Sequence, residues 1–174
     1  MRSKVKLASV MMVMMLSLVL LAGCSGKKVT LRRVTYEIPG NYKMTSQIGS
    51  DTATYVAKNG FEDSAVLRFK SSLGNLFDSE TFDKECIRYA DSCLKSTPEV
   101  SEYTIVENTK TEWLGMPAVK FMANAVSTTG KALVVEGLFS YDAENNAIYN
   151  IYLTRPSSNF AGDFDSILNN AKLN

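Results

Sequence analysis

The sequence predicts an α+β domain in which an antiparallel β-sheet of about seven strands packs against two or more helices. Three observations lead to this prediction. Several short segments alternate apolar and polar side chains, as half-buried strands do. Links of a few residues join consecutive segments, which indicates antiparallel hairpins. Two other segments repeat apolar residues at three- and four-residue spacing, as amphipathic helices do.

Three strands are predicted in the first half of the domain. They cover residues 29–38, 52–58 and 65–71, separated by turn-like residues at Pro39-Gly40, Asn59-Gly60 and Asp63-Ser64. In the third segment Leu67 and Phe69 alternate with Arg68 and Lys70. This alternation is typical of an antiparallel strand with one face in water.

Four more strands are predicted in the second half. They cover residues 102–112, 117–127, 131–141 and 147–154, with short links at 115–117, 128–130 and 142–146. Links of this length make antiparallel hairpins. The last link, DAENN, contains oxygen ligands of the kind that calcium prefers, but it lacks the ligand ladder and glycine of an EF-hand loop. A polar hairpin turn accounts for it better, because Asn and Asp tolerate a left-handed backbone.

Two helices are predicted to cover the sheet. The first spans residues 79–96, with Asp78 or Ser79 as its N-cap and Pro98 after its end. The second lies within residues 159–173, behind Ser157-Ser158 as candidate caps, and its first turn carries Asp163 and Asp165. Each helix has one apolar stripe, so each must pack on the sheet.

The N-terminus predicts export. Residues 1–6 carry Arg2, Lys4 and Lys6 without an acidic residue, and residues 7–22 are apolar except for two serines. A basic start, an apolar core and small residues before a cleavage site describe a signal peptide, here residues 1–23. The alternative is a short N-terminal transmembrane anchor, for which the apolar run falls short of the usual ~20 residues.

The end of the apolar run resembles the lipobox of bacterial lipoproteins, with Leu21, Ala22, Gly23 and Cys24 in the four positions. The resemblance implies that Cys24 carries diacylglycerol, that cleavage occurs before it, and that the protein faces outward from the cell membrane. Two acyl chains are enough for stable anchoring. Residues 24–28 then form the lipidated N-terminus and a tether of at most ~14 Å, and residues 29–174 form a single domain.

The segments YEIPGNYKM (36–44), LGMPAVKFMANA (114–125) and FDSILNNAKL (164–173) resemble the Mog1/PsbP-like fold, which many small bacterial lipoproteins of unassigned function share. The resemblance covers about residues 30–172 and lies in spacing and order rather than in an invariant motif. Tyr42 stands where a Trp is often found. The family has no shared catalytic residues, so the resemblance implies none here.

The sequence predicts no enzyme, no cofactor and no metal site. It contains no histidine, which removes the commonest general base and the His-containing nucleophile pairs and zinc sites. Its acidic residues form scattered local pairs to which we assign no site. Removal of Arg2, Lys4 and Lys6 lowers Lys+Arg from 19 to 16 against 18 Asp+Glu, so a near-neutral domain gives no reason to expect nucleic acid as a partner.

Cys86 and Cys93 are predicted to be free, buried thiols. Seven residues of helix separate them by about 10.5 Å along the axis, whereas disulfides need Cα atoms within roughly 7 Å. A second hypothesis concerns the tyrosines: Tyr152, with Tyr141 or Tyr55, would form an exposed platform for a sugar or peptide. The alternative is that these rings belong to the core.

These observations favour a lipid-anchored envelope protein with a non-enzymatic binding or accessory domain held close to the membrane. Its partners would be the membrane, through the lipid on Cys24, and another envelope protein. The alternative function is a domain that binds or hydrolyses a cell-wall component or small ligand with carboxylates and tyrosines.

Overall fold

Two antiparallel sheets form the framework of the molecule. The computed structural model describes residues 26–59, 63–74 and 79–174. The strands are β1 (Lys27–Leu31), β2 (Val34–Ile38), β3 (Lys43–Ile48), β4 (Thr52–Asn59), β5 (Asp63–Leu73), β6 (Val100–Trp113), β7 (Met116–Ser127), β8 (Ala132–Asp142), β9 (Ala147–Pro156) and β10 (Lys172–Leu173). The helices are α2 (Ser79–Lys95) and α3 (Asp163–Asn169).

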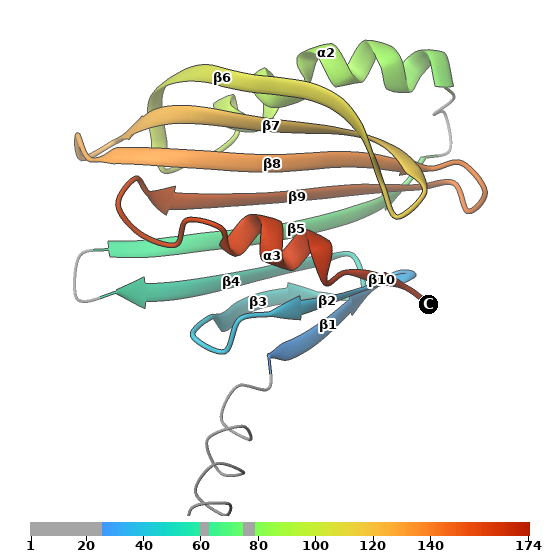
Figure 1. Cartoon of the computed structure of the whole chain (residues 1–174), viewed down its shortest axis with the longest axis horizontal. Coiled ribbons are helices and arrows are strands. Elements are labelled where there is room, and N and C mark those ends of the chain that lie inside the picture. Colours follow the sequence, from blue (N-terminus) through green and yellow to red (C-terminus); the bar gives the residue numbers. More distant parts are fainter. Residues whose placement is uncertain (1–25, 60–62, 75–78) are drawn as a thin grey trace, which may run out of the picture.

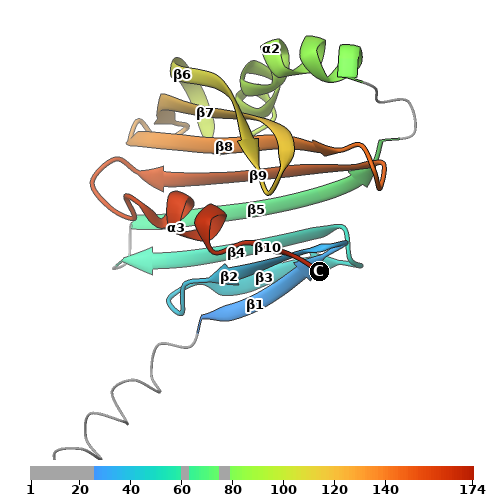
Figure 2. The same cartoon turned by 45° about the vertical axis from the view of Figure 1, so that its right-hand side comes forward.

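The larger sheet has seven strands in the order β3-β4-β5-β9-β8-β7-β6, and the smaller sheet has the order β1-β2-β10. Each neighbouring pair in the larger sheet is antiparallel, which the short links predict for the hairpins but not for β5 and β9. α2 lies at the β6 end of the larger sheet, whereas β1 and β3 lie at the other end (Figure 1). The turned view shows the same separation (Figure 2). The α+β fold class is confirmed.

Apolar residues fill both sides of the larger sheet. On one side, the core packs between this sheet, the smaller sheet and α3. There Tyr36 of β2 lies 4.6 Å from Phe69 of β5, measured between ring centroids. The Trp113 indole N–H donates a 3.2 Å hydrogen bond to the Leu168 carbonyl oxygen, which ties the β6–β7 hairpin to α3. On the other side, the apolar stripe of α2 packs against β6, β7 and β8.

The N-terminal region differs from the prediction in three places. Residues 29–38 form a hairpin, β1 and β2, rather than one strand, because Arg32 takes a left-handed backbone with φ of 52°. The edge strand β3 was not predicted, since all of its side chains are exposed and it has no apolar face. Asp63 and Ser64 belong to β5 rather than to a turn. Gly60 lies outside the described residues.

α2 ends within one residue of its predicted limit. Of its predicted stripe Tyr89 is half-buried, and the other five residues are buried: Phe82, Cys86, Ala90, Cys93 and Leu94. It begins at Ser79, and Asp78 lies outside the described residues.

α3 is shorter than the prediction. It begins at Asp163, after Gly162 with φ of 83°, so Ser157 and Ser158 are not its caps. Asp163 and Asp165 do lie in its first turn. The chain then leaves the helix and pairs with β2 as β10. No helix in the described part of the chain is long and apolar enough to cross a membrane.

Candidate functional site

α2 covers only part of the sheet face on which it lies. It packs mainly against β6, β7 and β8, at one end of the sheet. Farther along the same face, the strand register aligns Thr54, Arg68 and Tyr152 in one row across β4, β5 and β9. These three side chains are only half-buried. One pocket lies beside this row and another lies over it.

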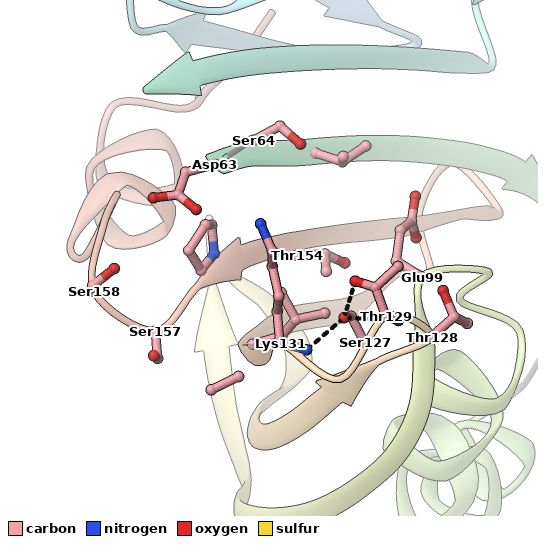
Figure 3. Close-up of a pocket in the computed structure, with 14 residues that line it drawn as sticks. Asp63, Ser64, Glu99, Ser127, Thr128, Thr129, Lys131, Thr154, Ser157 and Ser158 are labelled. Carbon is pink, nitrogen blue, oxygen red and sulfur yellow. Dashed lines mark hydrogen bonds between the residues drawn. The ribbon is translucent and has the colours of Figure 1, made fainter. Parts of the chain in front are cut away.

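The first, which we call the strand-end pocket, has a volume of about 400 Å³. The starts of β5 and β8, the end of β9 and the turns beside them form its walls. Many of its lining residues carry hydroxyl groups: Ser64, Ser127, Thr128, Thr129, Thr154, Ser157 and Ser158. Its charged lining residues are Asp63, Glu99 and Lys131. Figure 3 shows Asp63 and Glu99 on opposite sides of the pocket, with Lys131 and Thr154 between them.

Ser127 shapes the turn that presents Lys131 to this pocket. Its hydroxyl oxygen accepts hydrogen bonds from the backbone N–H groups of Thr129 at 3.2 Å and Lys131 at 2.9 Å. Gly130 completes the turn with φ of 82°, a left-handed conformation that suits glycine. The β7–β8 connection is therefore a defined wall of the pocket (Figure 3).

The second, which we call the helix-side pocket, has a volume of about 320 Å³ and lies between α2 and the open strands. α2 contributes Tyr89, Ser92, Cys93 and Ser96, and the strands contribute Thr52, Thr54, Arg68, Phe69, Lys70, Asn150 and Tyr152. Arg68 lies over the Tyr152 ring, with its guanidinium carbon 5.5 Å from the ring centroid. This distance is typical of a cation–π contact.

An ion pair between Arg68 and Glu99 joins the two pockets, because Arg68 lines one and Glu99 lines the other. We call the two pockets and this ion pair the paired pockets. Among the described residues, only five buried side-chain polar atoms lack a hydrogen-bond partner, and three of them are here: Arg68 Nη1, Glu99 Oε2 and Thr154 Oγ1. Buried polar atoms normally have partners. Three such atoms around one ion pair make the pair the candidate binding centre, which a polar ligand reaches when the two side chains move apart.

Burial holds three ionisable groups beside the helix-side pocket neutral: Cys93, Tyr152 and Tyr89. Burial raises the pKa of the Cys93 thiol to about 11. Burial also raises the pKa of Tyr152 and of Tyr89, whose hydroxyl donates to the Leu138 carbonyl oxygen at 3.3 Å. A neutral thiol is a poor nucleophile. The Cys93 thiol is therefore suited to packing rather than to nucleophilic attack.

The carboxylates of the strand-end pocket are engaged by the protein itself. Glu99 pairs with Arg68, and Asp63 accepts a 3.3 Å hydrogen bond from the Asn159 side-chain amide. Within the described ranges, no group of three or more His, Cys, Asp or Glu side chains is arranged to hold a metal ion. The strand-end pocket is therefore a hydroxyl-lined cavity with one cationic and two anionic side chains on its walls.

The structure confirms some of the predicted site features. Cys86 and Cys93 are buried and form no disulfide with each other, as the helix spacing predicts. Residues 142–146 form a hairpin turn, in which Asp142 accepts a 3.1 Å hydrogen bond from the Asn145 backbone N–H. Asn146 takes the expected left-handed backbone with φ of 49°. The lipobox residues Leu21, Ala22, Gly23 and Cys24 lie outside the described residues.

The exposed tyrosine platform is not present. Tyr55 and Tyr141 are buried, and Tyr55 points to the face opposite α2, where it packs against Phe69. Tyr152 is half-buried beneath Arg68. The alternative, that these rings belong to the core, is correct for Tyr55 and Tyr141.

Sequence reasoning missed the residues that join the paired pockets. Arg68 was recognised only as a water-facing residue of its strand, and neither Glu99 nor Thr154 was singled out. The available signal was the run of polar residues, Asn150, Tyr152 and Thr154, that alternates with the apolar face of β9. It became informative only once β9 was known to lie beside β5.

The two sheets, their order and the flanking helices define a Mog1/PsbP-like α+β domain, as the sequence resemblance implies. Cyanobacterial PsbP (CyanoP) from Synechocystis sp. PCC 6803 superimposes with a TM-score of 0.61 at 6% identity, covering 87% of this chain and 95% of that one. The Saccharomyces cerevisiae Ran-binding protein Mog1p superimposes with a TM-score of 0.51 at 10% identity, covering 87% of this chain and 96% of that one. Identities this low show the shared fold alone.

A third solved structure, from Bacteroides thetaiotaomicron VPI-5482, gives a TM-score of 0.57 at 10% identity. The match covers 86% of this chain but 49% of that one, so this chain spans about half of its length. No protein-family model matches the sequence, and no curated protein is detectably similar to it.

Proposed function

We propose that the protein is a lipid-anchored, non-enzymatic accessory domain on the outer side of a bacterial cell membrane. In this proposal it binds another envelope protein through the paired pockets. The anchor is the diacylglycerol that the lipobox resemblance implies on Cys24, and it holds the domain at the membrane surface.

The observation that carries the binding role is the convergence of Arg68 Nη1, Glu99 Oε2 and Thr154 Oγ1 without partners. A peptide segment that displaces the Arg68–Glu99 pair offers both carbonyl oxygens, which accept from Arg68, and N–H groups, which donate to Glu99. Apolar lining residues such as Val66, Leu133 and Pro156 give such a segment a surface to pack against. One protein of this fold, Mog1p, binds Ran, and this supports the proposal of a protein partner.

Site-specific photocrosslinking in the native cells tests this proposal. A photoreactive amino acid replaces Thr128 on the rim of the strand-end pocket, and Thr111 on the exposed strand β6 serves as the control position. We expect one protein to be captured from position 128 and not from position 111. Equal capture from both positions would overturn the assignment of the binding surface.

A second candidate is binding or hydrolysis of a cell-wall fragment, which the hydroxyl-rich lining and the two carboxylates of the strand-end pocket favour. Incubation of the protein with peptidoglycan fragments separates the two functions. Turnover that Glu99→Gln abolishes, while the circular dichroism spectrum is unchanged, would replace the accessory role with an enzymatic one.

A further inference from the structure

The first strand begins almost at the proposed lipid anchor. β1 starts at Lys27, so only Ser25 and Gly26 separate Cys24 from the folded domain. Two residues span at most about 7 Å, which is half of the length that the sequence suggests for the tether. If the anchor of the proposed function is correct, the part of the domain beside Lys27 must lie at the lipid headgroups.

We propose that this part of the domain binds anionic lipid directly, through Lys27, Lys28, Lys43 and Lys58. We call these four residues the basic edge. This inference rests on the proposed function, because the anchor determines which part of the domain meets the membrane.

Contacts in the structure place Lys27 beside the edge strand of the larger sheet. The Lys27 amino group donates a 3.2 Å hydrogen bond to the Tyr42 carbonyl oxygen. The next residue, Lys43, begins β3, and it lines a hollow of about 370 Å³ together with Lys58. All four lysines of the basic edge are exposed. Lys28 forms an exposed ion pair with Glu37, with 3.7 Å between Nζ and Oε1. An exposed pair of this kind is worth little, so lipid phosphates can compete for Lys28 and approach the other lysines directly.

The charge of the domain is divided along the sheet in the direction that this orientation requires. Residues 26–59, which hold β1 to β4, contain six Lys and Arg against two Asp and Glu. Residues 79–113, which hold α2 and β6, contain four Lys and Arg against eight Asp and Glu. β3 and β6 are the opposite edges of the larger sheet. The positive end therefore carries the anchor, and the negative end points away from an anionic surface.

The exposed edge of β3 gives a second reason for contact with the membrane. The side chains of β3 are exposed throughout, and Met44 leaves 49% of its surface in water. An unpaired edge strand is a site for unwanted pairing with other chains. A lipid surface against this edge shields it and accepts the Met44 side chain at the headgroup boundary.

Vesicle binding by the unlipidated protein tests the inference. All described core residues lie after residue 26, so the mature chain 24–174 with Cys24→Ser retains the whole fold. Vesicles of phosphatidylglycerol and phosphatidylcholine are compared with pure phosphatidylcholine by co-sedimentation at low salt. We expect binding only to the anionic vesicles, weakened by added salt. Equal binding to both vesicles, or binding to neither, would overturn the inference.

Paired variants locate the contact. The double variant Lys43→Gln with Lys58→Gln should weaken binding to anionic vesicles about 25-fold, because each lysine contributes a factor of about five. The matched control, Lys84→Gln with Lys95→Gln on α2, removes the same charge from the other end and should change binding less than twofold. Equal losses in both variants would show a net-charge effect and overturn the inference. Displacement by millimolar glycerol phosphate would do so as well, because it would indicate a site for a soluble anion.

The outcome is separable from that of the proposed function. Radiolabelled fatty acid in the native cells tests attachment to Cys24, and the vesicle assay uses a chain without the lipid. If the protein is lipidated in cells but its unlipidated form does not bind anionic vesicles, lipid binding by the basic edge is refuted. The proposed function is left intact by that result.

Discussion

At Gly137 the backbone of β8 passes directly beneath the ring of Phe121 on β7. A Cβ atom at this position would lie 2.1 Å from the Phe121 Cε1 atom, far inside van der Waals contact. Phe121 is fully buried and belongs to the core between the larger sheet and α2. We expect Gly137→Ala to lower the free energy of unfolding by about 1–3 kcal/mol, the usual cost of overpacking. Urea unfolding followed by Trp113 fluorescence measures this change.

Two further variants establish the cause. Gly40→Ala serves as the control, because a Cβ atom at position 40 would meet no atom within 4 Å. Its free energy of unfolding should stay within about 0.5 kcal/mol of the parent. In a Phe121→Leu background, Gly137→Ala should cost much less, since the ring that it meets is gone. A cost unchanged by Phe121→Leu would contradict the steric explanation.

Cys93 provides a test of the neutral helix-side pocket. Burial raises the pKa of its thiol to about 11, whereas an ordinary unfolded thiol ionises near about 8.5. The folded state therefore favours the neutral thiol, and this contribution to stability is complete below about pH 8.5 and is lost as the pH rises toward 11.

We expect iodoacetamide at pH 8 to label Cys86 and Cys93 at least about 100-fold more slowly in the native protein than in guanidinium, because only the exposed thiolate reacts. Mass spectrometry of the mature chain with Cys24→Ser measures both rates. Rapid labelling of Cys93 without denaturant would show that the pocket opens to solvent or that the thiol is ionised.

Among the elements, the β6–β7 hairpin is tied to α3 by Trp113 and by an ion pair between Lys120 and Asp165. Trp113 donates its N–H to the Leu168 carbonyl oxygen and stacks on Tyr36 at 6.1 Å between ring centroids. We expect Trp113→Phe to lower the free energy of unfolding by about 1–3 kcal/mol, from the lost hydrogen bond and the smaller ring. Circular dichroism in urea measures this, because Trp113 is the only tryptophan.

The matched control is Tyr103→Phe, an aromatic residue on the same strand. Its hydroxyl donates to Asp91 at the exposed side of α2, so its loss should leave the urea midpoint nearly unchanged. If the two variants shifted the midpoint equally, the Trp113 contact would not be the main link between hairpin and helix.

Elements whose signal is local were predictable from the sequence. β6 to β9 fall within about two residues of the prediction, because their hairpin turns and apolar alternation are both short-range features. β3 escaped prediction because it has no buried face. The β1–β2 turn escaped because Arg32 adopts a left-handed backbone without the glycine or asparagine that usually signals one.

The candidate site was not predictable in the same way, because it depends on pairing between distant segments. Arg68 and Tyr152 are neighbours only because β5 pairs with β9. Glu99 reaches them from the connection between α2 and β6. No periodicity in the sequence states which strand lies beside which, so the ion pair that joins the two pockets becomes visible only in the folded chain.

At the scale of the whole molecule, the sheet order sets the height of the paired pockets above the proposed membrane surface. β5 and β9 are two and three strands from the β3 edge. At a strand spacing of ~4.8 Å, the paired pockets lie about 10–14 Å beyond the basic edge. A partner reached at this height is one whose binding segment stays close to the lipid, such as the short exposed part of a membrane-embedded protein.

A longer tether tests this geometry. Insertion of twenty Gly and Ser residues after Ser25 leaves the lipidation sequence intact but allows the domain to move over roughly 25 Å. We expect the variant to stay in the membrane fraction, whereas capture of the partner from position 128 should fall several-fold, because the effective concentration of the pockets at the right height decreases. Cys24→Ser, as the unanchored control, should move the protein out of the membrane fraction. Undiminished capture with the long tether would show that the domain finds its partner without being held at a fixed height.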